Sequence, residues 1–248
     1  MKSVAKAARV GARYAWLWRN RSIFENFGNV VSPDRPRLLV DVSAIMQGDA
    51  QTGIQRVVRA IWGELLRRSG SEFVVVPIFA TNSQGYCYAP LDFLSGEKCT
   101  SPVKPVSPCP GDHFLGLDLS AHLLPKFRRQ LRAWKTRGSK IHLIVYDLLP
   151  LLQPDWFNPA ATSHFRRWFE VLCQDADYAI CISDQVTQDL RRYLGKDSTL
   201  SIGRLQMGWD INASIPSKGV SSEVARALEW VRSRPAILMV GTVEPRKG

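Results

Sequence analysis

The apolar positions of the chain form short continuous runs that are separated by helical stripes. The runs are typical of buried strands and lie at 37–42, 73–79, 113–117, 141–146, 178–182, 200–205 and 237–240. Stripes at helical spacing lie between or after them, at 54–65, 127–134, 165–173, 186–194 and 220–232. A strand, a helix and another strand predict a parallel pair with a right-handed crossover. Repetition of this unit predicts an α/β fold with a doubly wound, Rossmann-like parallel sheet.

Three parts are expected from the breaks in this pattern. Ser32–Pro36 holds two prolines and reads as a linker, so residues 1–36 form a separate N-terminal segment. The Rossmann-like domain then covers 37–218, with a proline-rich insertion or long loop at 81–110. Residues 219–248 are expected to hold a linker helix and the first strand of a second, truncated domain, because the last apolar run stops at a glycine.

The polar residues that follow the strands are the first candidates for function, since ligands of such sheets bind beyond the carboxyl ends of the strands. Gly53 opens a helix whose free amides would favour a phosphate, or it only relaxes a tight turn. Asp147 would accept hydrogen bonds from ligand hydroxyl groups, or it caps the following turn. Ser183 would contact the same ligand, or it is an ordinary helix N-cap.

The last residues of the chain carry a second candidate site. Gly241 ends an apolar run, and Arg246 and Lys247 follow it closely. Two cations beside backbone amides at the start of a coming helix would bind an anion. The alternative is a basic turn on the surface.

These motifs resemble those of the family 4 retaining glycosyltransferases (glycosyl transferases group 1), which have the GT-B fold. The resemblance rests on Val-Gly-Thr-Val-Glu-Pro-Arg-Lys-Gly at 240–248, on the strand and Thr-Gly-Ile-Gln-Arg-Val within 40–57, and on Tyr-Asp-Leu-Leu-Pro at 146–150. The family often has two adjacent glycines where this chain has only Gly53, and histidine where it has Tyr146.

The resemblance assigns roles to the candidate residues. It implies that Gly53 and Gly241 approach the nucleotide sugar and that Arg246 and Lys247 neutralise its diphosphate. It implies that the acceptor binds at two further residues, Asp147 and Ser183. The family's paired glutamates, spaced Glu-x7-Glu, would lie beyond Gly248, so no catalytic residue is expected within this chain and the fragment alone is expected to be inactive.

The activity implied by the resemblance is transfer of a hexose, such as mannose, with retained configuration. The donor would be a nucleotide diphosphate sugar, and the acceptor a glycan or lipid-linked glycan in cell-surface polysaccharide synthesis. No cofactor or metal is expected, because two side-chain cations would neutralise the departing diphosphate and no Asp-x-Asp motif occurs in the chain.

The charge of the chain favours anionic partners. Lys and Arg number 33 against 22 Asp and Glu, a net charge of +11. Residues 1–22 contain six of the basic residues and no acidic one, in a pattern typical of a basic amphipathic helix with two tryptophans. This segment would contact an anionic membrane, or it packs on its own domain or serves as a linker. Since the sequence has no signal-peptide pattern and no stretch long enough to span a bilayer, we expect a cytoplasmic protein, peripheral on the inner membrane.

The cysteines and histidines add no catalytic pattern. The five cysteines form no CxxC pair, which favours a reducing compartment over a disulfide framework. The four histidines match no nucleophile or metal pattern and are interpreted as structural. Two other functions remain open: a non-catalytic glycan- or nucleotide-binding module that acts with a partner, and a nucleic-acid binder. Because no helix-turn-helix, zinc-finger or RNA-recognition signature occurs, nucleic acid is not an expected partner.

Overall fold

The structure is a computed structural model, described here for residues 35–48, 52–70, 73–95, 104–196, 198–208, 221–235 and 237. The chain divides into two units, one up to Leu205 and one from Gln206, and each is treated by itself. In the second unit, α9 spans Ser222–Arg232, and the Ser221 hydroxyl caps it by accepting a hydrogen bond from the Val224 amide. The predicted basic helix at 1–22 lies outside the described residues.

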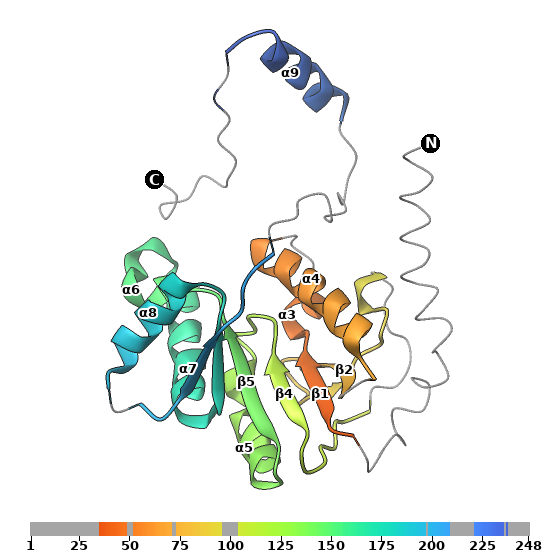
Figure 1. Ribbon diagram of the computed structural model, residues 1–248, viewed down its shortest axis with the longest axis vertical. Coiled ribbons are helices and arrows are strands. Elements are labelled where there is room, and N and C mark those ends of the chain that lie inside the picture. Colours follow the sequence, from red (N-terminus) through yellow and green to blue (C-terminus); the bar gives the residue numbers. More distant parts are fainter. Residues whose placement is uncertain are drawn as a thin grey trace. The chain divides into compact units, whose positions relative to one another are not determined.

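The first unit contains a seven-stranded sheet with strand order β3-β2-β1-β4-β5-β6-β7 (Figure 1). Every pairing is parallel except the antiparallel pair of β2 and β3. The strands are β1 (Arg37–Asp41), β2 (Val74–Phe79), β3 (Cys87–Tyr88), β4 (His113–Gly116), β5 (Lys140–Val145), β6 (Tyr178–Cys181) and β7 (Ser201–Arg204). The prediction of a doubly wound, Rossmann-like parallel sheet is confirmed.

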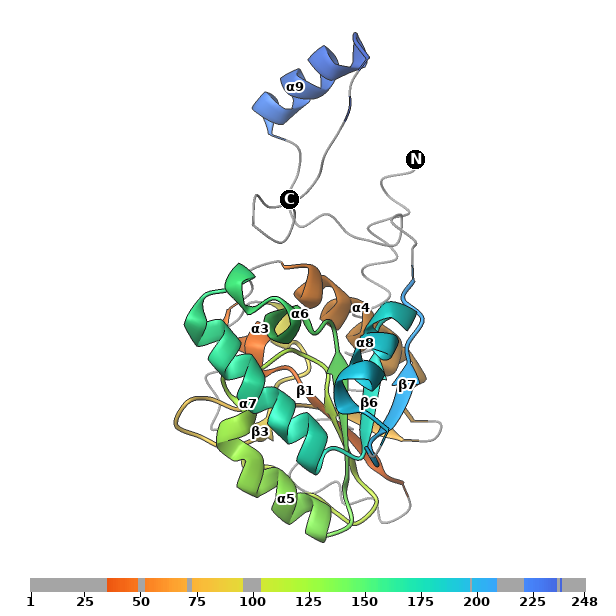
Figure 2. The same cartoon turned by 90° about the vertical axis from the view of Figure 1, so that its left-hand side faces the viewer.

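Helices cover the two faces of this sheet and close two apolar cores. They are α3 (Ser43–Gln47), α4 (Gly53–Arg68), α5 (Arg128–Thr136), α6 (Leu149–Leu152), α7 (Pro159–Asp175) and α8 (Asp184–Leu194). On one face, Trp62 and other residues of α4 pack with Val40 and Leu115 of the strands. On the other face, α5 and α7 lie side by side, and their apolar residues join Leu39, Phe114 and Ile141 (Figure 2). Each large side chain buried in this way contributes roughly 1.5–3 kcal/mol to folding.

The segment 81–110 differs from the predicted loop. Its residues Cys87 and Tyr88 form β3, which extends the sheet beside β2. Tyr86 is completely buried, and its ring packs edge-on against Phe114 at a centroid distance of 5.2 Å. The segment therefore supplies an edge strand and an aromatic ring of the core. Its scattered prolines had indicated a loop instead.

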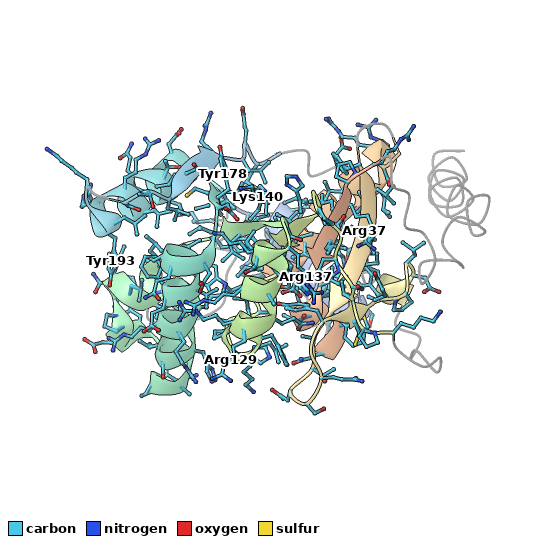
Figure 3. All side chains as sticks on the ribbon, turned by 90° about the horizontal axis from the view of Figure 1, so that it is seen from below. Arg37, Arg129, Arg137, Lys140, Tyr178 and Tyr193 are labelled. Atoms are coloured by element: carbon cyan, nitrogen blue, oxygen red, sulfur yellow. The ribbon has the colours of Figure 1, made fainter. Side chains whose placement is uncertain are left out.

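A buried ion pair closes the amino edge of the sheet at Arg37, the first residue of β1, which is labelled in Figure 3. Arg37 and Asp112 are 7% and 1% exposed, and the shortest of their contacts joins Arg37 Nη2 to Asp112 Oδ2 at 2.5 Å. The guanidinium also donates to the Tyr88 hydroxyl and the Ser107 carbonyl, while the carboxylate accepts from the Cys109 amide at 2.7 Å. Burial alone would lower the pKa of Arg37, but its hydrogen bond and charge interaction with Asp112 raise that pKa above its ordinary value.

Candidate functional site

The carboxyl ends of the parallel strands bring the loops after β1, β4, β5 and β6 to one edge of the sheet. This carboxyl edge carries α6 and the N-terminal end of α4, both at the upper side of the sheet in Figure 1. Of the six residues predicted as ligand contacts, Gly53, Asp147 and Ser183 lie in the described part of the chain. The other three, Gly241, Arg246 and Lys247, lie outside it.

Asp41, the last residue of β1, lies at the centre of the carboxyl edge and is fully buried. Its Oδ1 accepts hydrogen bonds from the amide and the hydroxyl of Ser43. Its Oδ2 accepts from the Tyr86 hydroxyl at 3.0 Å and the Ser120 hydroxyl at 2.9 Å. Burial raises the pKa of this carboxyl, although the four hydrogen bonds act in the opposite direction. Asp41 thus connects the end of β1 to the segments that contain Tyr86 and Ser120, and all of these hydrogen-bond donors are uncharged.

A second buried carboxylate, Asp118, follows β4 beside it. Asp118 is 4% exposed, and its Oδ2 accepts from the Ile45 amide at 2.6 Å, which fixes the start of α3. Burial raises the pKa of Asp118 to about 6, and the nearby charge of Asp41 adds to the rise. Asp118 in turn raises the pKa of the Tyr146 hydroxyl, second to burial, and this hydroxyl donates to the Leu117 carbonyl at 2.6 Å.

Sequence reasoning did not single out Asp118, Ser120 or Tyr86. Asp118 follows a predicted strand, so the rule that located Asp147 and Ser183 would also have found it. No local pattern marks Tyr86, because its partner Asp41 lies 45 positions away in the chain. The protein's own donors occupy both oxygens of Asp41, so this group positions loops and does not react with a ligand.

Gly53 is the first residue of α4 and is exposed. Thr52 precedes it as N-cap in a capping box, in which its hydroxyl accepts from the Gln55 amide and the Gln55 side chain accepts from the Thr52 amide. The backbone of Gly53 is not in the left-handed region, and a Cβ built there would meet no atom within 4 Å. Within the described residues, therefore, neither a tight turn nor packing requires glycine here.

The N-terminal amides of α4 are partly unused. The Gln55 and Arg56 amides are bonded to Thr52. Among the described residues, the Gly53 and Ile54 amides have no hydrogen-bond acceptor. An anion placed there would gain these two donors and the positive end of the helix dipole.

Asp147 and Ser183 lie where the sequence placed them, directly after β5 and β6. Asp147 is half-buried, and its Oδ1 accepts from the Leu149 amide at 3.1 Å, so it caps the turn that starts α6. The Ser183 hydroxyl accepts from the Val186 amide at 3.2 Å and is the N-cap of α8. Both therefore have the capping role that was the alternative to ligand binding. A carboxylate has further lone pairs, so the cap leaves Asp147 able to accept from a ligand as well.

The four histidines form two pairs in the structure. His113 Nδ1 and His142 Nε2 are 2.8 Å apart, with stacked rings. The His122 and His164 rings lie 6.4 Å apart near the carboxyl edge, and His122 Nε2 lies 3.0 Å from Gln47 Oε1. Burial lowers the pKa of both His122 and His142. Within the part of the chain that the structure describes, no group of three His, Cys, Asp or Glu side chains is arranged to hold a metal ion.

Comparison with known proteins finds similarity to one kind of enzyme. The chain is 34% identical, over 223 residues, to a serotype-specific mannosyltransferase WbdA of Escherichia coli. It is 32% identical, over 227 residues, to a second Escherichia coli protein of the same description. Each match covers 86% of this chain but only 27% and 26% of the relative, so the chain spans about a quarter of the length of these relatives. No protein-family model matches the chain.

None of the helices in the described ranges is both long enough and apolar enough to cross a bilayer. The similarity to mannosyltransferases, the Rossmann-like sheet and the capped helix N-terminus at its carboxyl edge are together the observations on which a function has to rest.

Proposed function

We propose that the protein is a glycosyltransferase that moves a mannose residue from a nucleoside diphosphate sugar to a glycan or lipid-linked glycan in cell-surface polysaccharide synthesis. The observation that carries this proposal is the 34% identity, over 86% of the chain, to a protein described as a serotype-specific mannosyltransferase. The doubly wound sheet supports it, because such sheets bind nucleotides beyond the carboxyl ends of their strands.

In this proposal the protein is a retaining enzyme of the GT-B fold, and the described sheet belongs to its acceptor-side domain at 37–218. Residues 219–248 begin the donor-binding domain, and the paired glutamates of that family follow later in the intact polypeptide. Residues 1–22 hold the enzyme against an anionic membrane at the cytoplasmic face. A non-catalytic module that binds a glycan beside a partner enzyme is the competing outcome.

In this proposal, some of the candidate residues bind the donor and others bind the acceptor. The Gly53 and Ile54 amides, which have no acceptor among the described residues, would face the donor diphosphate at the positive end of α4. Arg246 and Lys247 would neutralise the charge that develops on the departing nucleoside diphosphate. Asp147 and Ser183 would accept hydrogen bonds from acceptor hydroxyl groups. Two side-chain cations would make a resident metal unnecessary, so activity should survive a chelator.

The test is a transfer assay with the purified product of the intact gene. Labelled nucleoside diphosphate hexoses are offered one at a time with a mannose-terminated oligosaccharide, and the product's anomeric configuration is read by NMR. We expect transfer from a mannose donor, with retention, in the presence of EDTA. The double substitution Arg246→Ala and Lys247→Ala should slow transfer about 100-fold. A folded protein that transfers no hexose from any donor would contradict the proposal.

A further inference from the structure

The segment from Lys126 to Lys140 carries the highest density of positive charge in the described part of the chain. Its 15 residues include seven Lys and Arg and no Asp or Glu. The segment spans α5 and the turn into β5, and Leu131 and Trp134 place the apolar side of α5 in the core. Four cations on and after α5 are exposed, and they form the basic face: Arg129, Arg132, Arg137 and Lys140.

The nearby carboxylates neutralise only part of this charge. Asp175, at the end of α7, pairs with two arginines of the segment. Asp177 pairs with two lysines, whose Nζ atoms lie 3.2 Å and 3.6 Å from its Oδ1. These are the acids that pair with the segment among the described residues. The seven cations therefore keep an excess of five positive charges over the two carboxylates.

The net charge of the whole chain comes from this segment and one other. Six of the 33 Lys and Arg lie in residues 1–22 and seven in 126–140. When these and the two paired acids are set aside, 20 basic and 20 acidic residues remain, and they balance. A balanced charged surface is only a solvated one, whereas an excess of one sign creates a field that attracts partners of the opposite sign.

The basic face reaches the edge of the sheet at which the described chain begins. Lys140 and Arg37 are the first residues of β5 and β1. The Lys140 amide donates to the Asp112 carbonyl at 3.0 Å, and the Asp112 carboxylate pairs with Arg37. The description of the chain starts at Arg35, two residues before β1. The basic N-terminal segment is therefore covalently attached at the amino edge, where the basic face ends.

An exposed tyrosine at the same edge favours a lipid surface over a soluble polyanion. Tyr178 is the first residue of β6, the strand next to β5, and is 37% exposed. Figure 3 shows the molecule from the amino edge and labels Tyr178 beside Lys140. A tyrosine ring has an apolar body and a polar tip, which suits the headgroup region of a bilayer. Anionic headgroups supply the negative charge that complements the basic face.

We propose that the basic face docks on an anionic phospholipid bilayer, with Arg129, Arg137 and Lys140 at the headgroup phosphates. The carboxyl edge then lies farther from the bilayer by roughly 20 Å, the length of the six-residue strand β5. The docking does not depend on the proposed glycosyltransferase function. Only its consequence rests on that function: the enzyme would act on the far end of a long lipid-linked glycan and not next to the lipid.

The first experiment measures co-sedimentation of the chain with vesicles of phosphatidylcholine, with and without phosphatidylglycerol. The double substitution Arg129→Gln and Arg137→Gln should weaken binding to the anionic vesicles about 30-fold, since each cation near such a surface contributes about fivefold. Neither arginine has a hydrogen bond or ion pair within the described ranges, so the melting temperature should not change.

The matched control removes the same charge elsewhere. Arg166→Gln and Arg167→Gln change two exposed arginines in the first half of α7, which begins at the carboxyl edge. The net charge of this control equals that of the double variant, and its binding to anionic vesicles should stay close to that of the wild type. A control that weakens binding as much as the double variant would show that total charge matters and the position of the basic face does not.

Three further outcomes would overturn the proposal. One is that the folded chain does not bind anionic vesicles. Another is equal vesicle binding by the wild type and the double variant, because residues 1–22 would then account for the whole membrane contact. The third is that the double variant loses binding to heparin or duplex DNA but keeps its vesicle binding, which would assign the basic face to a soluble polyanion.

A transfer assay on the same variants separates this proposal from the proposed function. If the gene product transfers mannose but the double variant binds vesicles like the wild type, the docking surface is wrong and the enzyme assignment stands. If vesicle binding falls as expected but no hexose is transferred from any donor, the docking surface stands and the enzyme assignment is wrong.

Discussion

The two edges of the sheet each contain a buried carboxylate, and their surroundings differ. At the amino edge, Asp112 is neutralised by Arg37 at 2.5 Å within a network of further donors. At the carboxyl edge, Asp41 is held only by neutral donors, and a second buried carboxylate, Asp118, raises the cost of its charge. Both carboxyls at this edge have raised pKa values.

The amino edge therefore stabilises the fold, whereas the buried carboxylates at the carboxyl edge cost electrostatic free energy. The amino edge satisfies every rule for a buried charge, since the pair is close and its remaining groups are hydrogen-bonded. The carboxyl edge departs from those rules at the strand ends where such sheets bind ligands. Natural proteins make such departures mainly at functional sites, where they fix loop geometry at the expense of stability.

The largest expected effect comes from breaking the amino edge. Arg37→Met leaves the Asp112 carboxylate buried without its cation, and we expect the free energy of unfolding to fall by about 3–5 kcal/mol in urea titrations. Adding Asp112→Asn to the same chain should restore only part of this loss. Asparagine removes the unpaired charge, but its one oxygen can accept from only one of the two backbone amides, of residue 37 and Cys109, which bind different oxygens of Asp112. A single variant within 1 kcal/mol of the wild type, about the cost of an exposed pair, would show that the pair is not a structural lock.

A smaller loss in the free energy of unfolding is expected when the Asp41 carboxylate is removed from the carboxyl edge. Asp41→Ala leaves the Ser43 amide and the hydroxyls of Tyr86 and Ser120 without their partner, at a cost of about 3 kcal/mol. Asp41→Asn should cost only about 1 kcal/mol, since the two hydroxyls can turn and accept from the new amide. Equal losses in the two variants, measured by urea unfolding, would mean that the negative charge itself is needed.

The raised pKa of Asp118 predicts a pH effect of known sign. The folded pKa is about 6, and an unfolded aspartate titrates near 3.9, so the folded state holds the proton more tightly. Protonation therefore stabilises the fold, and this stability is lost as the pH rises from about 4 through 6. The wild type should lose about 1 kcal/mol more than Asp118→Asn between about pH 5 and pH 7.

Unfolding titrations at several pH values measure this difference directly. The same substitution at the exposed Asp92 serves as the matched surface control. If the wild type and Asp118→Asn differ by the same amount at every pH, Asp118 does not titrate in this window and its burial is compensated in some other way.

The smallest expected change in stability distinguishes two glycines of α4. A Cβ would meet no atom within 4 Å at Gly53 or at Gly63. Both Gly→Ala variants should keep or raise the free energy of unfolding, by up to about 1 kcal/mol, because alanine favours the helix. Only Gly53→Ala should weaken binding of a nucleoside diphosphate sugar to the gene product. Equal donor affinity in the two variants, measured by calorimetry, would remove Gly53 from the proposed donor site.

The six parallel strands were predictable because each is a short apolar run, and the structure shifts their bounds by only one residue at an end. The two-residue edge strand β3 and the short helices α3 and α6 have no such run or stripe and were not predicted. Capping residues could also be predicted, since Thr52 and Ser183 act on amides three residues away. Structure that depends on residues close together in the chain is therefore predictable from the sequence.

The polar network at the carboxyl edge could not be predicted in the same way. Asp41 meets Ser120 across 79 positions and Tyr86 across 45, and no periodicity links such pairs. Contacts between residues far apart in the chain decide which groups are buried and which charges are paired, and only the structure shows these contacts.

Hydrogen–deuterium exchange of the gene product, with and without a nucleoside diphosphate mannose, tests most directly whether the carboxyl edge is the ligand-binding edge. The proposal predicts slower exchange in peptides that contain the start of α4 at Gly53 and Ile54 when the donor is present. Peptides of the amino edge around Arg37 and Asp112 should exchange at the same rate in both samples. Protection confined to the amino edge, or no protection anywhere in this sheet, would contradict the account.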